Sequence, residues 1–166
     1  MKQTLKILTV LFISLLIGCG GKEEKKKEGF SYEKTAPTEQ ATSAAETVPP
    51  SKRVNLSDKG LGPITSLELA SEIDQTMATH GEDVYKRMCT ACHRTDKKFI
   101  GPAPLGILER RTPEWVMNMI LNPEEMMQNN PLAKELLIEF NGAPMANQNL
   151  TEADARAVLE YFRTLK

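Results

Sequence analysis

The pattern of apolar and polar residues divides the chain of 166 residues into three parts. A basic end precedes an apolar run up to Ile17, and residues 20–60 then lack any periodic apolar pattern. From Thr65 onward, apolar residues recur at the three- and four-residue spacing of amphipathic helices. The pattern predicts a signal peptide, a disordered tether and a folded domain, at residues 1–18, 19–60 and 61–166.

The first helix of the domain is predicted from a capping box, in which the side chains of Thr65 and Glu68 would bond to backbone N–H groups at the helix start. A helix, continuous or broken near His80-Gly81, is then expected to run into Cys89. The apolar positions at helical spacing that support it are Ala70, Ile73 and Met77.

Three further helices are predicted towards the C-terminus. Thr112-Pro113-Glu114 is a favourable helix start, and Asn122-Pro123 ends that helix. Another follows Asn130-Pro131 and stops at Asn141-Gly142, and Thr151 caps the last. No strand-like alternation appears, so the fold class is all-α. The predicted buried faces are Trp115, Val116, Met119 and Ile120, then Ala133, Leu136, Leu137 and Phe140, then Ala155, Val158, Leu159 and Phe162.

Candidate chemistry is concentrated in Cys89-Thr-Ala-Cys92-His93. This spacing is the attachment signature of a c-type haem, in which each thiol adds across a vinyl group and the imidazole ligates the iron. Residues three apart share one face of a helical turn, so both sulfurs can reach one edge of the porphyrin. We therefore predict one covalently attached haem c, with His93 as a metal ligand.

A zinc site and a thiol redox centre are the two alternatives for the cysteine pair. A zinc site would need two more ligands, and Cys19 and His80 are the only other cysteine and histidine in the sequence. A thioredoxin-like site would need strands alternating with helices around the pair. His80 lies nine residues before Cys89 on the approach helix and is predicted to be a surface residue.

The N-terminal part carries a second signal. Leu16-Ile17-Gly18-Cys19 resembles the lipobox of bacterial lipoproteins, in which the cysteine is acylated. The alternative is an ordinary secretory signal with a chance cysteine. The resemblance implies lipidation at Cys19, a lipid anchor in a membrane of the cell envelope, and a domain in the periplasm or at the cell surface. The Lys/Glu run Lys22–Glu28 is a solvated spacer or, by another resemblance, a surface-export signal.

Charge excludes one class of partner. The formal net charge is −1, and the basic residues do not gather into a long run with aromatics, so no nucleic-acid partner is expected. Residues 61–166 hold fifteen Asp/Glu and eleven Lys/Arg, which makes the predicted domain mildly acidic.

Over residues 74–166, the chain resembles the class I cytochrome c family. Gly81 and Tyr85 precede the first cysteine at the family's spacing, and Val158 and Tyr161 match its last helix. The resemblance implies about four to five helices around one covalent haem. It also implies that the first and last helices cross at Gly81, where the missing side chain lets two backbones approach closely.

The resemblance also implies the surroundings of the iron. Gly101-Pro102 resembles the proximal loop, where the proline carbonyl accepts a hydrogen bond from the ligand histidine. The continuation Ala103-Pro104-Leu105 departs by one residue from the commoner Gly-Pro-x-Leu form of this loop. Met145 matches the axial methionine, whose soft thioether favours ferrous iron. Met126 and Met127 are weaker rivals, and the methionines expected to be core residues are Met88, Met117 and Met119.

Two functions from different classes remain open. One is an electron carrier whose iron is closed by His93 and Met145, and the other is a binder or sensor of a small gas such as NO, in which Met145 is labile. A haem enzyme is less favoured, because no distal His or Arg is apparent near Met145. The segment from Arg110 to Leu150 is similar to cytochrome lipoproteins that accompany nitrous oxide reductases. This likeness makes such a reductase a candidate redox partner, with a terminal oxidase or another reductase as rivals.

Overall fold

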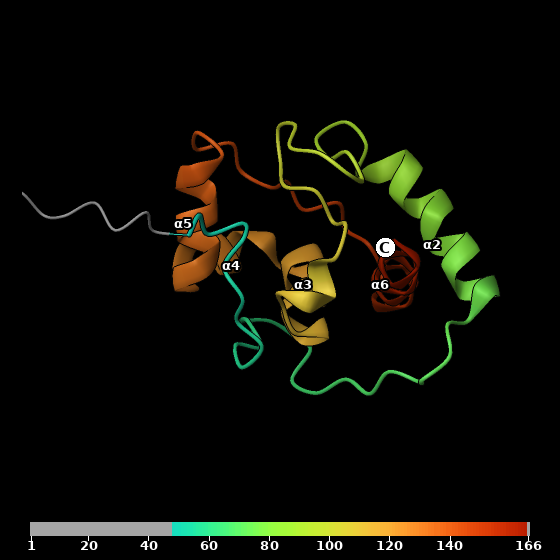
Figure 1. The fold of residues 1–166 in the computed structure, drawn as a ribbon. Coiled ribbons are helices and arrows are strands. Elements are labelled where there is room, and N and C mark those ends of the chain that lie inside the picture. Colours follow the sequence, from blue (N-terminus) through green and yellow to red (C-terminus); the bar gives the residue numbers. More distant parts are fainter. Residues whose placement is uncertain (1–47, 166) are drawn as a thin grey trace, which may run out of the picture. The chain divides into compact units, whose positions relative to one another are not determined.

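The computed structural model describes residues 48–165, which contain five α-helices and one short 3₁₀-helix (Figure 1). The helices are α2 (Gln75–Met88), η1 (Ile107–Glu109), α3 (Pro113–Leu121), α4 (Pro123–Asn129), α5 (Pro131–Glu139) and α6 (Glu152–Thr164). Within this part of the chain, the only β pairing is an isolated bridge between Asn55 and Arg111. The all-α fold class is therefore confirmed.

The predicted signal peptide and Cys19 lie outside the described residues. Between residues 48 and 165, none of the helices has the length and hydropathy of a membrane-spanning segment.

The first helix starts later than predicted. Asp74 is the N-cap of α2, and its carboxylate accepts the N–H of Met77 at 2.9 Å. The predicted capping box of Thr65 and Glu68 is wrong, because both residues lie outside any helix and are exposed. Once begun, α2 continues through Gly81 without a break.

Tertiary contacts explain why residues 61–73 are not helical. The N–H of Ile64 donates to Asn118 Oδ1 at 3.0 Å, and Asn118 Nδ2 donates back to Ile64 O at 2.9 Å. The N–H of Leu67 donates to Glu114 Oε1 at 3.3 Å. Side chains of α3 therefore bind backbone groups of residues 64 and 67, and these long-range contacts override the local helical pattern.

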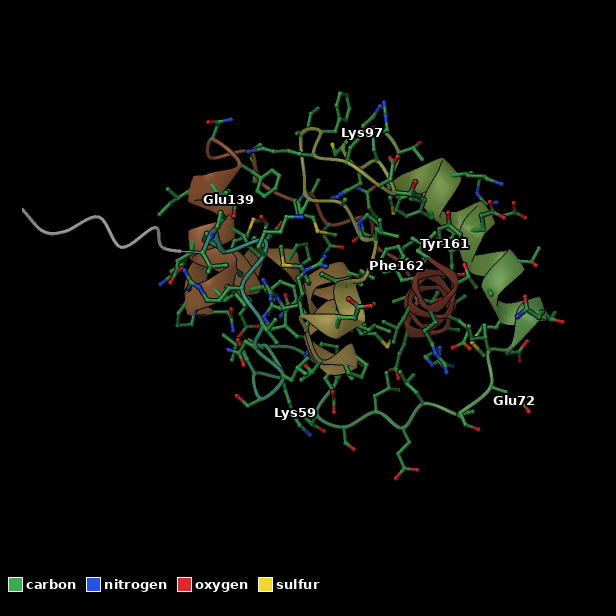
Figure 2. All side chains as sticks on the ribbon, in the orientation of Figure 1. Lys59, Glu72, Lys97, Glu139, Tyr161 and Phe162 are labelled. Carbon is green, nitrogen blue, oxygen red and sulfur yellow. The ribbon has the colours of Figure 1, made fainter. Side chains whose placement is uncertain are left out.

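Helices α2 and α6 cross at Gly81, as the family resemblance implied (Figure 1). A Cβ atom built on Gly81 would lie 1.9 Å from the carbonyl oxygen of Ala157, so only glycine permits this approach. Beyond the crossing, the rings of Tyr85 and Tyr161 pack with their centroids 5.5 Å apart. Figure 2 labels Tyr161 and Phe162 at this side of α6, where Phe162 meets Tyr85 edge-on.

The other predicted helix starts are confirmed by their caps. Thr112 Oγ1 accepts the N–H of Trp115 at 3.1 Å, Asn130 Oδ1 accepts that of Ala133 at 3.0 Å, and Thr151 Oγ1 accepts that of Asp154 at 3.1 Å. The helix α4 was not predicted. It starts at the same proline, Pro123, that ends α3, because proline fits the first helical turn as well as it terminates a preceding helix. Of the predicted faces, Met119, Leu137 and Phe162 are half-buried and the others are buried.

The domain begins before residue 61. Residues 49–60, here called the N-terminal strap, contact α5 and the segment before α3. The N–H of Ser51 donates to Glu139, labelled in Figure 2, at 2.7 Å. The guanidinium of Arg111 donates to the carbonyls of Pro50, at 2.6 Å, and Arg53. The predicted tether is therefore wrong for residues 48–60. The sequence shows these residues only as a polar linker, but the buried guanidinium of Arg111 binds their backbone carbonyls. Residues 19–47 of the predicted tether lie outside the described part.

Candidate haem site

The cysteine pair lies in tight turns at the end of α2. Cys89 caps the helix by donating its N–H to Tyr85 O at 2.9 Å, and the N–H groups of Cys92 and His93 both donate to Cys89 O, at 3.1 and 2.9 Å. Neither cysteine is in a disulfide, and Cys92 is exposed whereas Cys89 is half-buried. The sequence thus places both thiols and the imidazole within one compact turn.

The surroundings of Cys89 are unfavourable for a thiol redox centre. Burial, together with the nearby Cys92, raises the pKa of the Cys89 thiol to about 11, which is unfavourable for a reactive thiolate. Among residues 48–165, no three His, Cys, Asp or Glu side chains gather closely enough to hold a metal ion. His80 is exposed, as predicted, and pairs with Asp154 Oδ1 at 2.9 Å.

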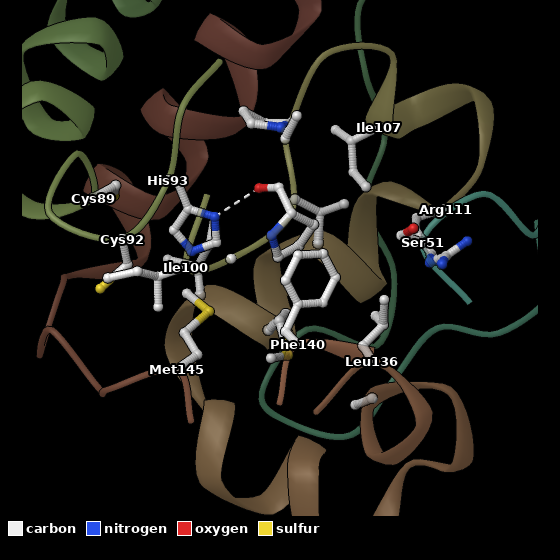
Figure 3. A pocket seen from close by; sticks show the side chains of 18 of the residues that line it. Ser51, Cys89, Cys92, His93, Ile100, Ile107, Arg111, Leu136, Phe140 and Met145 are labelled. Atoms are coloured by element: carbon white, nitrogen blue, oxygen red, sulfur yellow. Dashed lines mark hydrogen bonds between the residues drawn. The ribbon is translucent and has the colours of Figure 1, made fainter. Parts of the chain in front are cut away.

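The imidazole of His93 is held from one side by the Gly101-Pro102 loop. His93 Nδ1 lies 2.8 Å from Pro102 O, and the N–H of Gly101 donates to Cys92 O at 2.8 Å (Figure 3). A carbonyl only accepts, so Nδ1 carries the proton and Nε2 presents a free lone pair. This is the arrangement that a metal-ligating histidine needs.

Gly101 is required for this approach. A Cβ atom at Gly101 would lie 2.4 Å from His93 Cε1 and 2.8 Å from Nδ1. The loop is therefore shaped around the imidazole.

A cavity with mainly apolar walls opens beside the imidazole (Figure 3). Its walls come from the loop after the cysteines, from α3, α5 and α6, and from residues 143–148. The apolar side chains among them include Ile107, Val116, Ile120, Leu136, Phe140 and Val158. Such a lining can enclose the faces of a porphyrin and exclude water from them.

Met145 lines the same cavity from the segment between α5 and α6. In Figure 3, the side chains of Met145 and His93 point toward one another, with Cys92 at the same end of the cavity. Of the rival sulfurs, Met126 is fully buried and is not part of the cavity wall. Met127 does line the cavity, and its sulfur accepts the backbone N–H of Met145 at 3.4 Å.

Positive charge lies at the other end of the cavity, where Figure 3 shows Arg111 beside Ser51. Arg111 is 1% exposed, and none of the ion pairs among residues 48–165 involves it. Burial lowers the pKa of Arg111, yet a guanidinium stays charged at neutral pH. The Nε atoms of Arg110 and Arg111 are buried without a hydrogen-bond partner in the described part.

These residues fit a haem. Thiols and an imidazole lie at one end of an apolar cavity, a thioether faces the imidazole, and two arginines provide the favourable potential that haem carboxylates need. Sequence reasoning found the first four groups through the cysteine motif and the family resemblance. It missed the role of Arg111, whose only signal was its place just before the Thr112 cap.

A helical domain with this attachment turn and these two facing ligand candidates defines a c-type cytochrome. Residues 78–166 match the family model described as Cytochrome c, and the chain belongs to the cytochrome c family. Its fold is that of the class I members, it carries covalently attached haem c, and a domain of this family transfers electrons through its haem.

Solved structures agree with this assignment. A cytochrome c from Rhodothermus marinus is 43% identical, covers 63% of this chain and 89% of its own, and superposes with a TM-score of 0.61. An engineered form of the Rhodothermus marinus protein is 42% identical over 63% and 90% of the two chains, with a TM-score of 0.60. Another engineered form, bound to a carbene intermediate, is 42% identical over 63% and 89%, with a TM-score of 0.58. The search of curated proteins gave no match.

Proposed function

We propose that this protein is a lipid-anchored monohaem cytochrome that carries electrons to or from a respiratory or denitrification redox enzyme. The observation that carries the proposal is that His93 and Met145 face one another beside the cysteine pair, so they would hold the iron of a bound haem from both sides. With both side chains engaged, the iron would exchange electrons rather than substrates.

The haem supplies an iron that cycles between ferric and ferrous states when bound. The chain's own residues set its environment. Pro102 O fixes the tautomer and the plane of the His93 ring, so Nε2 is held ready as a ligand. As a ligand, the neutral thioether of Met145 would favour ferrous iron and would raise the reduction potential relative to a second histidine. The apolar wall excludes water, which limits the rearrangement of solvent when the charge of the iron changes.

Electrons would enter and leave where the cysteine edge meets solvent. Cys92 is exposed, and Phe99 and Ile100 after it expose 45% and 46% of their surface. Lys97 and Lys98 flank these apolar side chains and are exposed as well. An apolar patch with a cationic rim suits transient docking to a redox partner with an acidic rim. Nitrous oxide reductase is the first candidate, on the sequence resemblance, and a terminal oxidase or another reductase is the alternative.

The experiment is optical and uses the complete protein. Reduced-minus-oxidised spectra are recorded with and without CO and NO, and ferrous protein is then mixed with nitrous oxide reductase or a terminal oxidase. A low-spin spectrum that CO leaves unchanged, with oxidation by one of these enzymes, supports the carrier. Immediate CO and NO binding with no electron transfer supports the gas binder instead.

The gas-binding alternative has one observation in its favour. An engineered relative has been solved with a carbene intermediate bound, so a domain of this fold can accept an exogenous group. The CO and NO arms of the spectral experiment distinguish the two functions.

The anchor part of the proposal rests on Leu16-Ile17-Gly18-Cys19. Acyl chains contribute about 0.8 kcal/mol per buried CH₂, and more than one chain gives stable membrane binding. We expect the mature chain to start at an acylated Cys19, with its domain in the periplasm or at the cell surface. Mass spectrometry of the N-terminal peptide tests this, and an unmodified N-terminus at another residue would remove the lipoprotein claim.

A further inference from the structure

Two neighbouring methionines on α4 contact different parts of the domain through their sulfur atoms. Met126 Sδ accepts the N–H of Leu61 at 3.0 Å, just after the N-terminal strap. Met127 Sδ accepts the N–H of Met145 at 3.4 Å. This short helix therefore connects the residue that follows the strap to the segment that carries the candidate sixth ligand.

Residues 144–149, here called the Met145 segment, have few other constraints. Left-handed backbone lies just before the segment and at its last residue, with φ of 59° at Asn141, 73° at Gly142 and 53° at Asn149. Within residues 144–149, the other side-chain hydrogen bonds are internal to the segment, from Gln148 to Ala146 and from Asn149 to Asn147. In the described part of the chain, the bond to Met127 is the only hydrogen bond that joins residues 144–149 to another element.

We propose that Met127 is a positioning residue for the sixth ligand. Its thioether holds the backbone of Met145 at the cavity wall and so limits how often the Met145 sulfur leaves the iron. A thioether is a weak acceptor, so the contact contributes little to global stability. It acts on a segment that nothing else fixes by hydrogen bonds, and the effect is therefore expected in ligand exchange. The inference rests on the proposed role of Met145.

Met117 on α3 provides the control. It is buried and does not line the cavity, and its sulfur accepts no hydrogen bond among the described residues. Replacing either methionine by leucine keeps an apolar side chain of similar volume, which cores tolerate well. Only Met127→Leu removes an acceptor from Met145.

The test compares wild-type holoprotein with Met127→Leu and Met117→Leu. Amide exchange at Met145 is followed by NMR, and CO binding to the ferrous protein by stopped flow. Met127→Leu should accelerate both by about threefold to tenfold, as expected for the loss of one weak hydrogen bond, whereas Met117→Leu should stay within about twofold of wild type. Met127→Gln, whose amide oxygen can accept the same N–H, should restore the slow amide exchange.

Each outcome bears on the inference in a distinct way. Equal rates in the two leucine variants, with the Met–Fe(III) near-infrared band present in wild type, would overturn the role of Met127 and leave the ligation by Met145 intact. Absence of that band from wild type would overturn both. Loss of the band in Met127→Leu but not in Met145→Ala would make Met127 the ligand itself, against the positioning role.

Discussion

Gly101 lies so close to His93 that any side chain there would displace the imidazole: its Cβ atom would lie 2.4 Å from Cε1. We expect Gly101→Ala to move the ring off the Pro102 carbonyl, weaken the low-spin spectrum, and lower the free energy of unfolding by about 1–3 kcal/mol, the usual cost of overpacking. Absorption spectra and denaturant unfolding of the holoprotein measure the two effects.

Gly142→Ala is the control for that substitution. Gly142 has a φ of 73°, and a Cβ atom there would meet nothing within 4 Å. Its replacement should cost about 1 kcal/mol for the left-handed backbone alone and leave the spectrum unchanged. Identical spectra for both alanine variants would show that the loop can retreat from the imidazole at Gly101.

Shortening the chain tests the N-terminal strap. A protein that begins at residue 48 keeps the acceptors of Arg111, whereas one that begins at residue 61 loses Pro50 O and Arg53 O and exposes a buried guanidinium. We expect the shorter protein to be less stable by about 2–4 kcal/mol, since each buried donor left without a partner costs about 1–3 kcal/mol. Thermal unfolding of the two holoproteins gives the difference, and equal midpoints would mean that the strap adds no stability.

The contrast between α3 and the segment before α2 shows how far sequence reasoning reaches. Thr112 and Pro113 determine where α3 starts through local contacts, and such a start can be predicted. Thr65 and Glu68 offer an equally good local signal, yet Asn118 captures the backbone nearby. That competition involves residues more than fifty positions apart, and no local pattern contains it.

The site shows the same division. The thiols and His93 follow from a motif of five residues, and Met145 from family resemblance. Arg111 and Met127 could not be found in this way, because their importance depends on where the strap and the Met145 segment lie in three dimensions.

Glu160 should make stability depend on acid pH. Burial raises the pKa of this carboxyl, but hydrogen bonds from Arg156 and the N–H of Asp74, and the charges of Arg156 and Arg163, outweigh burial, so the pKa lies below its ordinary value of 4.5. A carboxyl with a lowered pKa stabilises the fold above about pH 4.5, and this contribution is lost as pH falls through the folded pKa.

Glu160→Gln should therefore be less stable than wild type at neutral pH. The difference in the free energy of unfolding between the two proteins should close as pH falls below about 4.5 and through the folded pKa of Glu160. Denaturant unfolding across this range measures it. Glu68→Gln is the control, because Glu68 is exposed and forms no ion pair among the described residues. A gap that stays constant with pH would mean that Glu160 acts through packing alone.

Met145→Ala distinguishes an electron carrier from a gas binder. If the Met145 sulfur is the sixth ligand, the ferric protein should show the weak near-infrared band of Met–Fe(III) ligation, and the variant should lose it. The variant should also bind CO and have a lower reduction potential, because the soft ligand that stabilised ferrous iron is gone. Met126→Leu is the control: Met126 is fully buried, does not line the cavity, and should leave band, potential and CO binding unchanged. The contradicting outcome is a wild-type protein that already binds CO rapidly, together with a Met145→Ala variant whose spectrum is unchanged. The sixth position would then be open in the wild-type protein, and a gas binder rather than a closed electron carrier would be the correct function.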